Sequence, residues 1–113
     1  MSRIEARLVE LGFPLPEVAK PVAAYAPFAV TGNLVFTAGQ LPFVNGALPA
    51  AGKVGEGAGL VDPAEAKNLA RLSALNALAA IKLAIGDLDR VTKVVKVVGF
   101  VASVPEFTGQ PGV

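Results

Sequence analysis

The stretch of residues 91–104 constrains the fold of this chain more than any other part of its sequence. It is dominated by valine, which favours the pleated geometry of a strand, so the sequence predicts one long β-strand here. Side chains alternate between the two faces of a strand. One face would carry Val91, Val95, Val97 and Val101, and the other Val94, Val98, Phe100 and Val104. Both faces are therefore apolar over most of the length.

A strand that is apolar on both faces needs cover on both. One layer of helices covers only one face of a sheet, and a chain of 113 residues has room for one domain with one core. We therefore expect residues 1–113 to form a single domain. Each large apolar side chain left in water forfeits roughly 1.5–3 kcal/mol, so several exposed together favour association. The strand pattern predicts an oligomer without fixing the number of subunits.

The clearest helix signal follows Asp62. An aspartate before proline suits the cap position of a helix, and Pro63 suits its first turn, with Glu65 close behind. The pattern predicts a helix that continues to about Ile85 and ends at Gly86. Its many alanines would allow close packing against a sheet.

The amino-terminal half is predicted to contain a short helix and a hairpin. Ser2 and Glu5 are spaced as a capping box for a helix that runs to about Leu11. Four prolines then predict an extended path over residues 13–27. Residues 28–30 and 34–38 are β-rich runs on either side of a Gly-Asn pair, which predicts a tight hairpin. Residues 41–60 are rich in glycine and proline and predict a long irregular connection.

Composition excludes several kinds of chemistry. The chain has no cysteine and no histidine, which removes disulfides, thiolate nucleophiles, Ser-His-Asp triads and metal sites built from thiolate or imidazole. We expect no metal and no cofactor. Any reaction would depend on carboxylates, hydroxyls, lysine, arginine, backbone groups or ordered water.

Charge and hydropathy bear on partners and location. The net charge is only +1, and the nearest approach to a basic cluster, Arg90, Lys93 and Lys96, alternates between the sides of a strand. Nucleic acid is therefore not an expected partner. The first residues do not form a signal peptide, and Asn76 and Lys82 interrupt the longest apolar stretches. We expect a cytoplasmic protein with no membrane partner.

Residues 31–42, with the sequence TGNLVFTAGQLP, resemble the signature of the YjgF/RidA family. The order that follows is also similar to the family: a glycine-rich loop, an alanine-rich helix with a central Asn76, a Gly-Asp-Leu run and the valine-rich strand. The strand ends near Phe100, and Phe107 follows it. The resemblance extends from about Tyr25 to Phe107.

The resemblance implies an α+β, chorismate-mutase-like fold with a ferredoxin-like βαβ arrangement, in which helices cover one face of a mixed sheet. It implies a homotrimer whose sheets form an inner barrel, with a ligand cleft at each subunit interface. Val95, Val97 and Val101 are the expected trimer contacts. The implied activity is metal-independent hydrolysis of reactive enamines and imines, such as 2-aminoacrylate, to 2-keto acids and ammonia.

The residues that match the ligand cleft of the family are few. Tyr25 matches an aromatic side chain that lies against the ligand, although a packed ring is an equal alternative. Thr37, Ala38 and Gly39 match the segment that lines the cleft, with Ala38 in the place of the usual serine. Gly39 would allow close backbone approach, either to ligand or to a neighbouring strand. Phe100 would line the cleft from the long strand, unless it is a core residue. No residue is assigned a catalytic role.

The chain ends at Val113, where family members continue through another helix and a final strand. That stretch carries the arginine that pairs with the substrate carboxylate and a glutamate that orients water, so we expect this sequence to be part of a longer protein. Three functions remain open. The first is an imine deaminase that acts on small 2-imino acids. The second is a trimer that binds a small carboxylate or imine without turnover, which Ala38 favours. The third and least favoured is an endoribonuclease or RNA binder.

Overall fold

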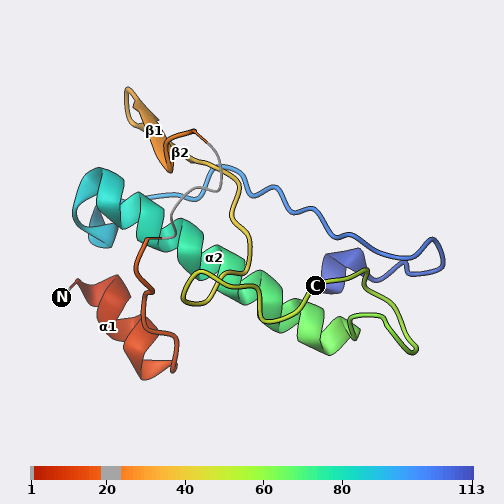
Figure 1. Ribbon diagram of the computed structural model, residues 1–113. Coiled ribbons are helices and arrows are strands. Elements are labelled where there is room, and N and C mark those ends of the chain that lie inside the picture. Colours follow the sequence, from red (N-terminus) through yellow and green to blue (C-terminus); the bar gives the residue numbers. More distant parts are fainter. Residues whose placement is uncertain (1, 19–23) are drawn as a thin grey trace.

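The computed structural model describes residues 2–18 and 24–113 and is built around one long helix, α2. Figure 1 shows the other elements arranged along this helix, with the hairpin and α1 near its carboxyl-terminal half. In chain order the elements are α1 (Arg3–Glu10), β1 (Phe28–Thr31), β2 (Leu34–Thr37), α2 (Pro63–Ile85) and the 3-10 turns η1 (Leu88–Arg90) and η2 (Gln110–Gly112).

Helix α2 begins and ends where its caps predict. The side chain of Asp62 accepts a hydrogen bond from the backbone N–H of Ala64 at 3.0 Å, and Pro63 occupies the first turn. Gly86 follows the last turn with φ +84°, and its N–H donates to the carbonyl of Lys82 at 2.7 Å. A positive φ is strained for residues with a Cβ atom, which explains why glycine stops the helix.

The face of α2 that packs inward is made mostly of small residues. Both strands of the hairpin and the turn η1 contact this helix. The buried residues of α2 are Ala66, Leu75, Asn76, Ala79 and Ala80. At the amino-terminal end of α2, Val54, Val61 and Ala66 form a buried cluster, and four partly buried residues pack against it: Leu69, Val101, Phe107 and Val113. Alanine on the helix lets these neighbours approach closely.

Helix α1 also follows its prediction. Ser2 caps it by accepting a hydrogen bond from the N–H of Glu5 at 3.1 Å, and Gly12 lies beyond its end with φ +83°. Tertiary contacts then hold α1 in place. Asp89 accepts hydrogen bonds from its first backbone N–H groups, and Lys82 of α2 pairs with Glu5 at 3.0 Å.

The predicted hairpin is confirmed. Strands β1 and β2 pair in antiparallel register, with Phe28 opposite Thr37 and Thr31 opposite Leu34. Only Gly32 and Asn33 connect the strands, and Gly32 has φ +55°. Positive φ at the first of two turn positions is typical of a type II′ turn, whose twist matches that of the strands.

The predicted strand over residues 91–104 is the principal correction. In the described part of the chain these residues are extended, but the sheet consists of β1 and β2 alone, so the expected mixed sheet is wrong there. Among the described residues, only the end of the segment is hydrogen-bonded to a distant part of the chain: the N–H of Val54 donates to the carbonyl of Ala102 at 2.8 Å, and the N–H of Val104 donates to that of Val54 at 3.0 Å. Propensity favours an extended backbone, but a strand also needs a neighbour to pair with.

The α+β class itself is confirmed, with helices α1 and α2 and a small antiparallel sheet against α2. The length and hydropathy of α2 differ from the expectation that Asn76 and Lys82 interrupt the apolar stretches too often for a membrane span. Helix α2 is 23 residues long, and a window of it reaches a mean hydropathy of 1.3, enough to cross a membrane by length and composition. In this structure the hairpin packs on α2, and 22% of that window is buried.

Candidate ligand site at the end of strand β2

The segment that follows β2 carries two of the predicted ligand contacts, Ala38 and Gly39, and is fixed at its start by the hairpin. The backbone N–H of Ala38 donates to the carbonyl of Pro27 at 2.9 Å, which continues the hairpin by one bond beyond the strands. The side-chain amide of Gln40 then donates to the carbonyl of Ala38 at 3.1 Å. We call residues 38–43 the strand-end segment.

Helix α2 fixes the other end of the strand-end segment. The amide nitrogen of Asn76 donates to the carbonyl of Leu41 at 3.0 Å and to that of Phe43 at 3.2 Å. The N–H of Phe43 also donates to the carbonyl of Leu41 at 2.8 Å, which closes a three-residue turn around Pro42. The segment is therefore held at both ends, with Gly39 and Gln40 between the two attachments.

Gly39 lies between these attachments beside open space. A Cβ atom built on Gly39 would meet no atom within 4 Å, and its φ lies outside the left-handed region. Neither backbone conformation nor packing among the described residues therefore requires glycine at this position. The expected approach of a neighbouring strand does not occur within the described chain. The free face of Gly39 is available to a ligand or to another molecule.

Two further predicted residues, Tyr25 and Thr37, lie next to the hairpin bond of Ala38 in the sequence. Tyr25 lies two residues before Pro27, whose carbonyl binds Ala38, and 45% of Tyr25 is exposed. Its ring is thus only partly packed. Thr37 is exposed and pairs with Phe28 across the hairpin, and Ala38 is half-buried.

Phe100 lies apart from the strand-end segment. It is 94% exposed and stands three residues before Ser103, which bridges to Val54 at the amino-terminal end of α2. In Figure 1 this part of the extended segment lies far along α2 from the hairpin. Phe100 is therefore not a core residue of the described chain, and a single chain does not bring it to Ala38 and Gly39.

The residues predicted for the trimer interface are divided. Val95 and Val97 are strongly exposed, Val97 to 82%, and they leave an apolar strip without cover in the described chain. Val101 instead packs against the buried cluster of Val54, Val61 and Ala66 in its own chain.

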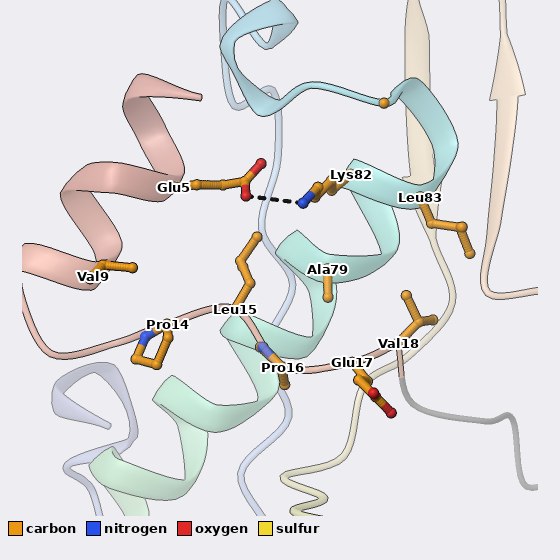
Figure 2. A pocket seen from close by; sticks show the side chains of 11 residues that line it. Glu5, Val9, Pro14, Leu15, Pro16, Glu17, Val18, Ala79, Lys82 and Leu83 are labelled. Atoms are coloured by element: carbon orange, nitrogen blue, oxygen red, sulfur yellow. Dashed lines mark hydrogen bonds and ion pairs between the residues drawn. The ribbon is translucent and has the colours of Figure 1, made fainter. Parts of the chain in front are cut away.

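The sequence did not predict the cavity of about 600 Å³ that lies between α1, residues 14–18 and α2. Figure 2 shows Glu5 and Lys82 facing each other at one side of it, with Leu15 directed toward the pair. Most of its lining is apolar. Because Glu5 and Lys82 neutralise each other at 3.0 Å, neither is a free group for chemistry.

Among the described residues, the carboxyl group whose pKa is shifted belongs to Asp89, which lies outside the strand-end segment. Hydrogen bonds from the backbone N–H groups of Arg3 and Ile4 lower the pKa of Asp89, and the Arg3 charge adds to this effect. Over residues 2–18 and 24–113 there is no cluster of three carboxylates that could hold a metal ion. What the strand-end segment offers a ligand is backbone polar groups, and the exposed Tyr25 lies two residues before Pro27, to which the segment is bound.

Asn76 is the residue whose role the sequence did not reveal. It appeared there only as the central asparagine of an alanine-rich helix. Its partners lie 33 and 35 positions earlier in the chain, so no local pattern could have paired them. The signal that was available is the presence of an amide among alanines and leucines, since a buried polar group requires partners.

Comparison with known proteins identifies the family. The family described as "YjgF/chorismate mutase-like, putative endoribonuclease" matches residues 5–108, nearly the whole chain. The chain belongs to the YjgF family. The chorismate-mutase-like fold expected from the strand-end sequence is thereby supported, and the match includes the hairpin, the strand-end segment, α2 and the extended segment.

Relatives of this YjgF-family protein include both curated and structurally characterised proteins. It is 37% identical over 111 residues to Protein TCP17 of Trypanosoma cruzi, a match that covers 96% of this chain and 66% of the relative. A crystal structure of a protein of unknown function from Agrobacterium tumefaciens is 48% identical with a TM-score of 0.82, covering 96% of this chain and 64% of that one. A "putative endoribonuclease" from Shewanella oneidensis MR-1 is 38% identical with a TM-score of 0.71, covering 79% and 57%. The chain thus spans between 57% and 66% of the length of these relatives.

Proposed function

We propose that this YjgF-family protein hydrolyses small reactive 2-imino acids to 2-keto acids and ammonia, with the imine bound against the strand-end segment. The observation that supports this most is the free face of Gly39, a glycine that the described chain itself does not require. Backbone groups on either side of Gly39 could approach a flat imine closely because no side chain intervenes.

The proposed reaction makes small demands on the protein. Water adds to the imine carbon, and the tetrahedral product loses ammonia to leave the keto acid. An imine carbon is already electrophilic, so positioning of the imine and of one water can supply much of the acceleration. A chain without histidine or cysteine can meet these demands with backbone groups and ordered water.

We further propose that the protein acts as a homotrimer, in which another copy covers the exposed part of the extended segment and completes the cleft. Two observations support this. The apolar side chains of Val95, Val97 and Phe100 lack cover within the described chain. The end of the extended segment that contains Phe100 also lies far along α2 from the hairpin in one chain, so a second copy is needed to place Phe100 and Ala38 beside one ligand.

A second candidate function is binding without turnover, and Ala38 favours it. Because Ala38 has no hydroxyl group, this position cannot orient water or substrate through its side chain. The same cleft could still bind a small carboxylate or imine through the backbone. RNA cleavage, the function that the names of the family and of the Shewanella protein suggest, finds less support here, because the basic residues of this chain are dispersed.

Turnover of 2-iminobutyrate generated in solution tests these alternatives. For the deaminase we expect loss of the imine faster than in buffer alone, with release of ammonia. Loss at the buffer rate would exclude this function. Thermal stabilisation by 2-ketobutyrate without turnover would then select the binding protein, whereas cleavage or salt-dependent retention of a mixed-sequence RNA would select the nucleic-acid function.

A further inference from the structure

Asn76 is an unusual residue for the centre of α2. Only 2% of its surface is exposed, and it lies among buried alanines and Leu75. Placing an amide group in an apolar interior is costly unless its polar atoms are hydrogen-bonded. Its amide nitrogen meets this requirement outside the helix, through the two carbonyls of the strand-end segment.

The strand-end segment depends on these bonds for its local structure. Pro42 has no N–H to donate to a strand ladder, and β2 ends at Thr37, so the described hairpin does not extend to Leu41 and Phe43. The carbonyl of Leu41 accepts from the N–H of Phe43 within the segment, and both carbonyls accept from Asn76 of α2. The backbone N–H groups within α2 are already used by the helix itself. A side chain with two N–H donors on one nitrogen can bind both carbonyls at once, and asparagine provides this.

Because Asn76 is hydrogen-bonded to Leu41, it also influences where the backbone of Gly39 lies. The hairpin holds Ala38 through Pro27, and Asn76 holds Leu41, so only Gly39 and Gln40 lie between fixed points. The three residue steps from Ala38 to Leu41 span at most about 10 Å, so a shift of Leu41 is transmitted to the backbone at Gly39.

We propose that Asn76 is a positioning residue, which sets the distance between the ligand-facing backbone at Gly39 and helix α2. It touches no substrate and acts through Leu41 and Phe43. This inference rests on the proposed binding of an imine or keto acid at the strand-end segment. It predicts that changes at Asn76 weaken ligand binding even where the protein remains fully folded.

Two substitutions separate positioning from packing. Asn76→Asp keeps the shape but, when ionised, has no donor for the two carbonyls. Burial and those carbonyl oxygens would raise the pKa of the new carboxyl, so acidification should return one O–H donor. Asn76→Gln keeps both donors but is one methylene longer, so it tests geometry alone. Asn68→Asp is the matched control, because Asn68 is exposed on the same helix and bonds only to Arg71 among the described residues.

The measurements are the dissociation constant for 2-ketobutyrate and the kcat/KM for 2-iminobutyrate, at a temperature well below the melting point of every variant. We expect Asn76→Asp at pH 8 and Asn76→Gln to weaken binding and to lower kcat/KM by roughly 10–100-fold, as misplacement by about 1 Å does elsewhere. We expect Asn76→Asp to recover part of its affinity between pH 8 and pH 5.5, relative to the unchanged protein. The control should follow the unchanged protein throughout.

Unchanged affinity in folded Asn76→Gln and Asn76→Asp would overturn the positioning role. If Asn76→Asp fails to fold, the result for Asn76→Gln decides the matter in the same way. Failure of the proposed function is recognised separately, because the unchanged protein would then neither bind 2-ketobutyrate nor hydrolyse the imine, and the positioning role would fall with it.

Discussion

The carboxylate of Asp89 lies 3.0 Å from the backbone nitrogen of Ile4, and a second bond of 2.9 Å joins it to the nitrogen of Arg3. Asp89, in η1, thus accepts hydrogen bonds from N–H groups at the start of α1, 85 positions earlier in the chain. Four such groups are free at the start of any helix, and a negative charge there is favourable. Ser2 satisfies another of them locally, so α1 has both a local and a distant cap.

This contact predicts a pH-dependent stability. The fold lowers the pKa of Asp89, so its stabilising effect is present above the ordinary aspartate pKa of about 3.9 and is lost as the pH falls through the lower folded value. We expect Asp89→Asn to lower Tm at pH 7, and we expect the difference in Tm from the unchanged protein to shrink as the pH falls below the ordinary aspartate value and through the lowered folded pKa. Thermal melts from pH 2 to pH 7 measure this, with the exposed Glu106→Gln as control. An equal deficit at both ends of the range would contradict it.

The ion pair between Glu5 and Lys82 should stabilise the docking of α1 measurably. Their side chains are 16% and 43% exposed, so water screens the pair only in part. A double-mutant cycle with Glu5→Gln and Lys82→Met should give a coupling of about 0.5–1 kcal/mol at low salt, which falls in 1 M salt. The exposed pair Arg7–Glu10 is a matched reference and should couple by less than about 0.5 kcal/mol. Equal coupling of the two pairs would show that burial does not matter here.

Gly86 and Gly55 should respond to alanine for different reasons. At Gly86 a Cβ atom meets nothing, but φ is +84°, so Gly86→Ala should cost about 1–2 kcal/mol of unfolding free energy through backbone strain. At Gly55 a Cβ atom would lie 2.8 Å from side-chain atoms of Leu60 and Val104, so Gly55→Ala should cost about 1–3 kcal/mol through overpacking. Adding Leu60→Ala should relieve part of the Gly55→Ala defect and none of the Gly86→Ala defect, as urea unfolding would measure.

Gly39→Ala should separate stability from binding. The new methyl group meets no atom and φ is ordinary, so we expect the unfolding free energy to stay within about 0.5 kcal/mol. If a ligand lies against this backbone, the methyl group should weaken 2-ketobutyrate binding by at least about ten-fold. Gly112→Ala meets the same two structural criteria and is the control. Unchanged binding in Gly39→Ala would move the ligand away from the strand-end segment.

The exposed extended segment predicts which face joins the copies. Val97 and Val98 lie on opposite faces and are both strongly exposed. If the face of Val95 and Val97 meets its counterparts in a trimer, Val97→Lys should weaken association by at least about ten-fold, and Val98→Lys should weaken it less. Sedimentation over a range of concentrations measures both. A monomeric unchanged protein would contradict the proposed trimer, and a larger effect of Val98→Lys would reverse the assigned face.

The sequence by itself determined the elements that local chemistry can specify. Ser2 and Asp62 cap their helices because side-chain oxygens reach N–H groups in the next turn, and Gly86 stops α2 because it tolerates positive φ. Gly32 likewise sets the hairpin turn. These interactions lie within a few residues, so the order of residue types is sufficient to predict them. Thr37, Ala38 and Gly39 form one contiguous run that resembles the family signature, and their contact with a ligand stays a prediction.

Only the tertiary structure decided what depends on residues far apart in the chain. It fixed the bonds of Asn76 to the strand-end segment, those of Asp89 to α1, and the packing of Val101 against the buried cluster rather than on a free face. It also left residues 91–100 extended without a paired neighbour in the described chain. The valines favour an extended backbone locally, but pairing in a sheet requires a second backbone at hydrogen-bonding distance, and a run of side chains carries no information on where that backbone lies.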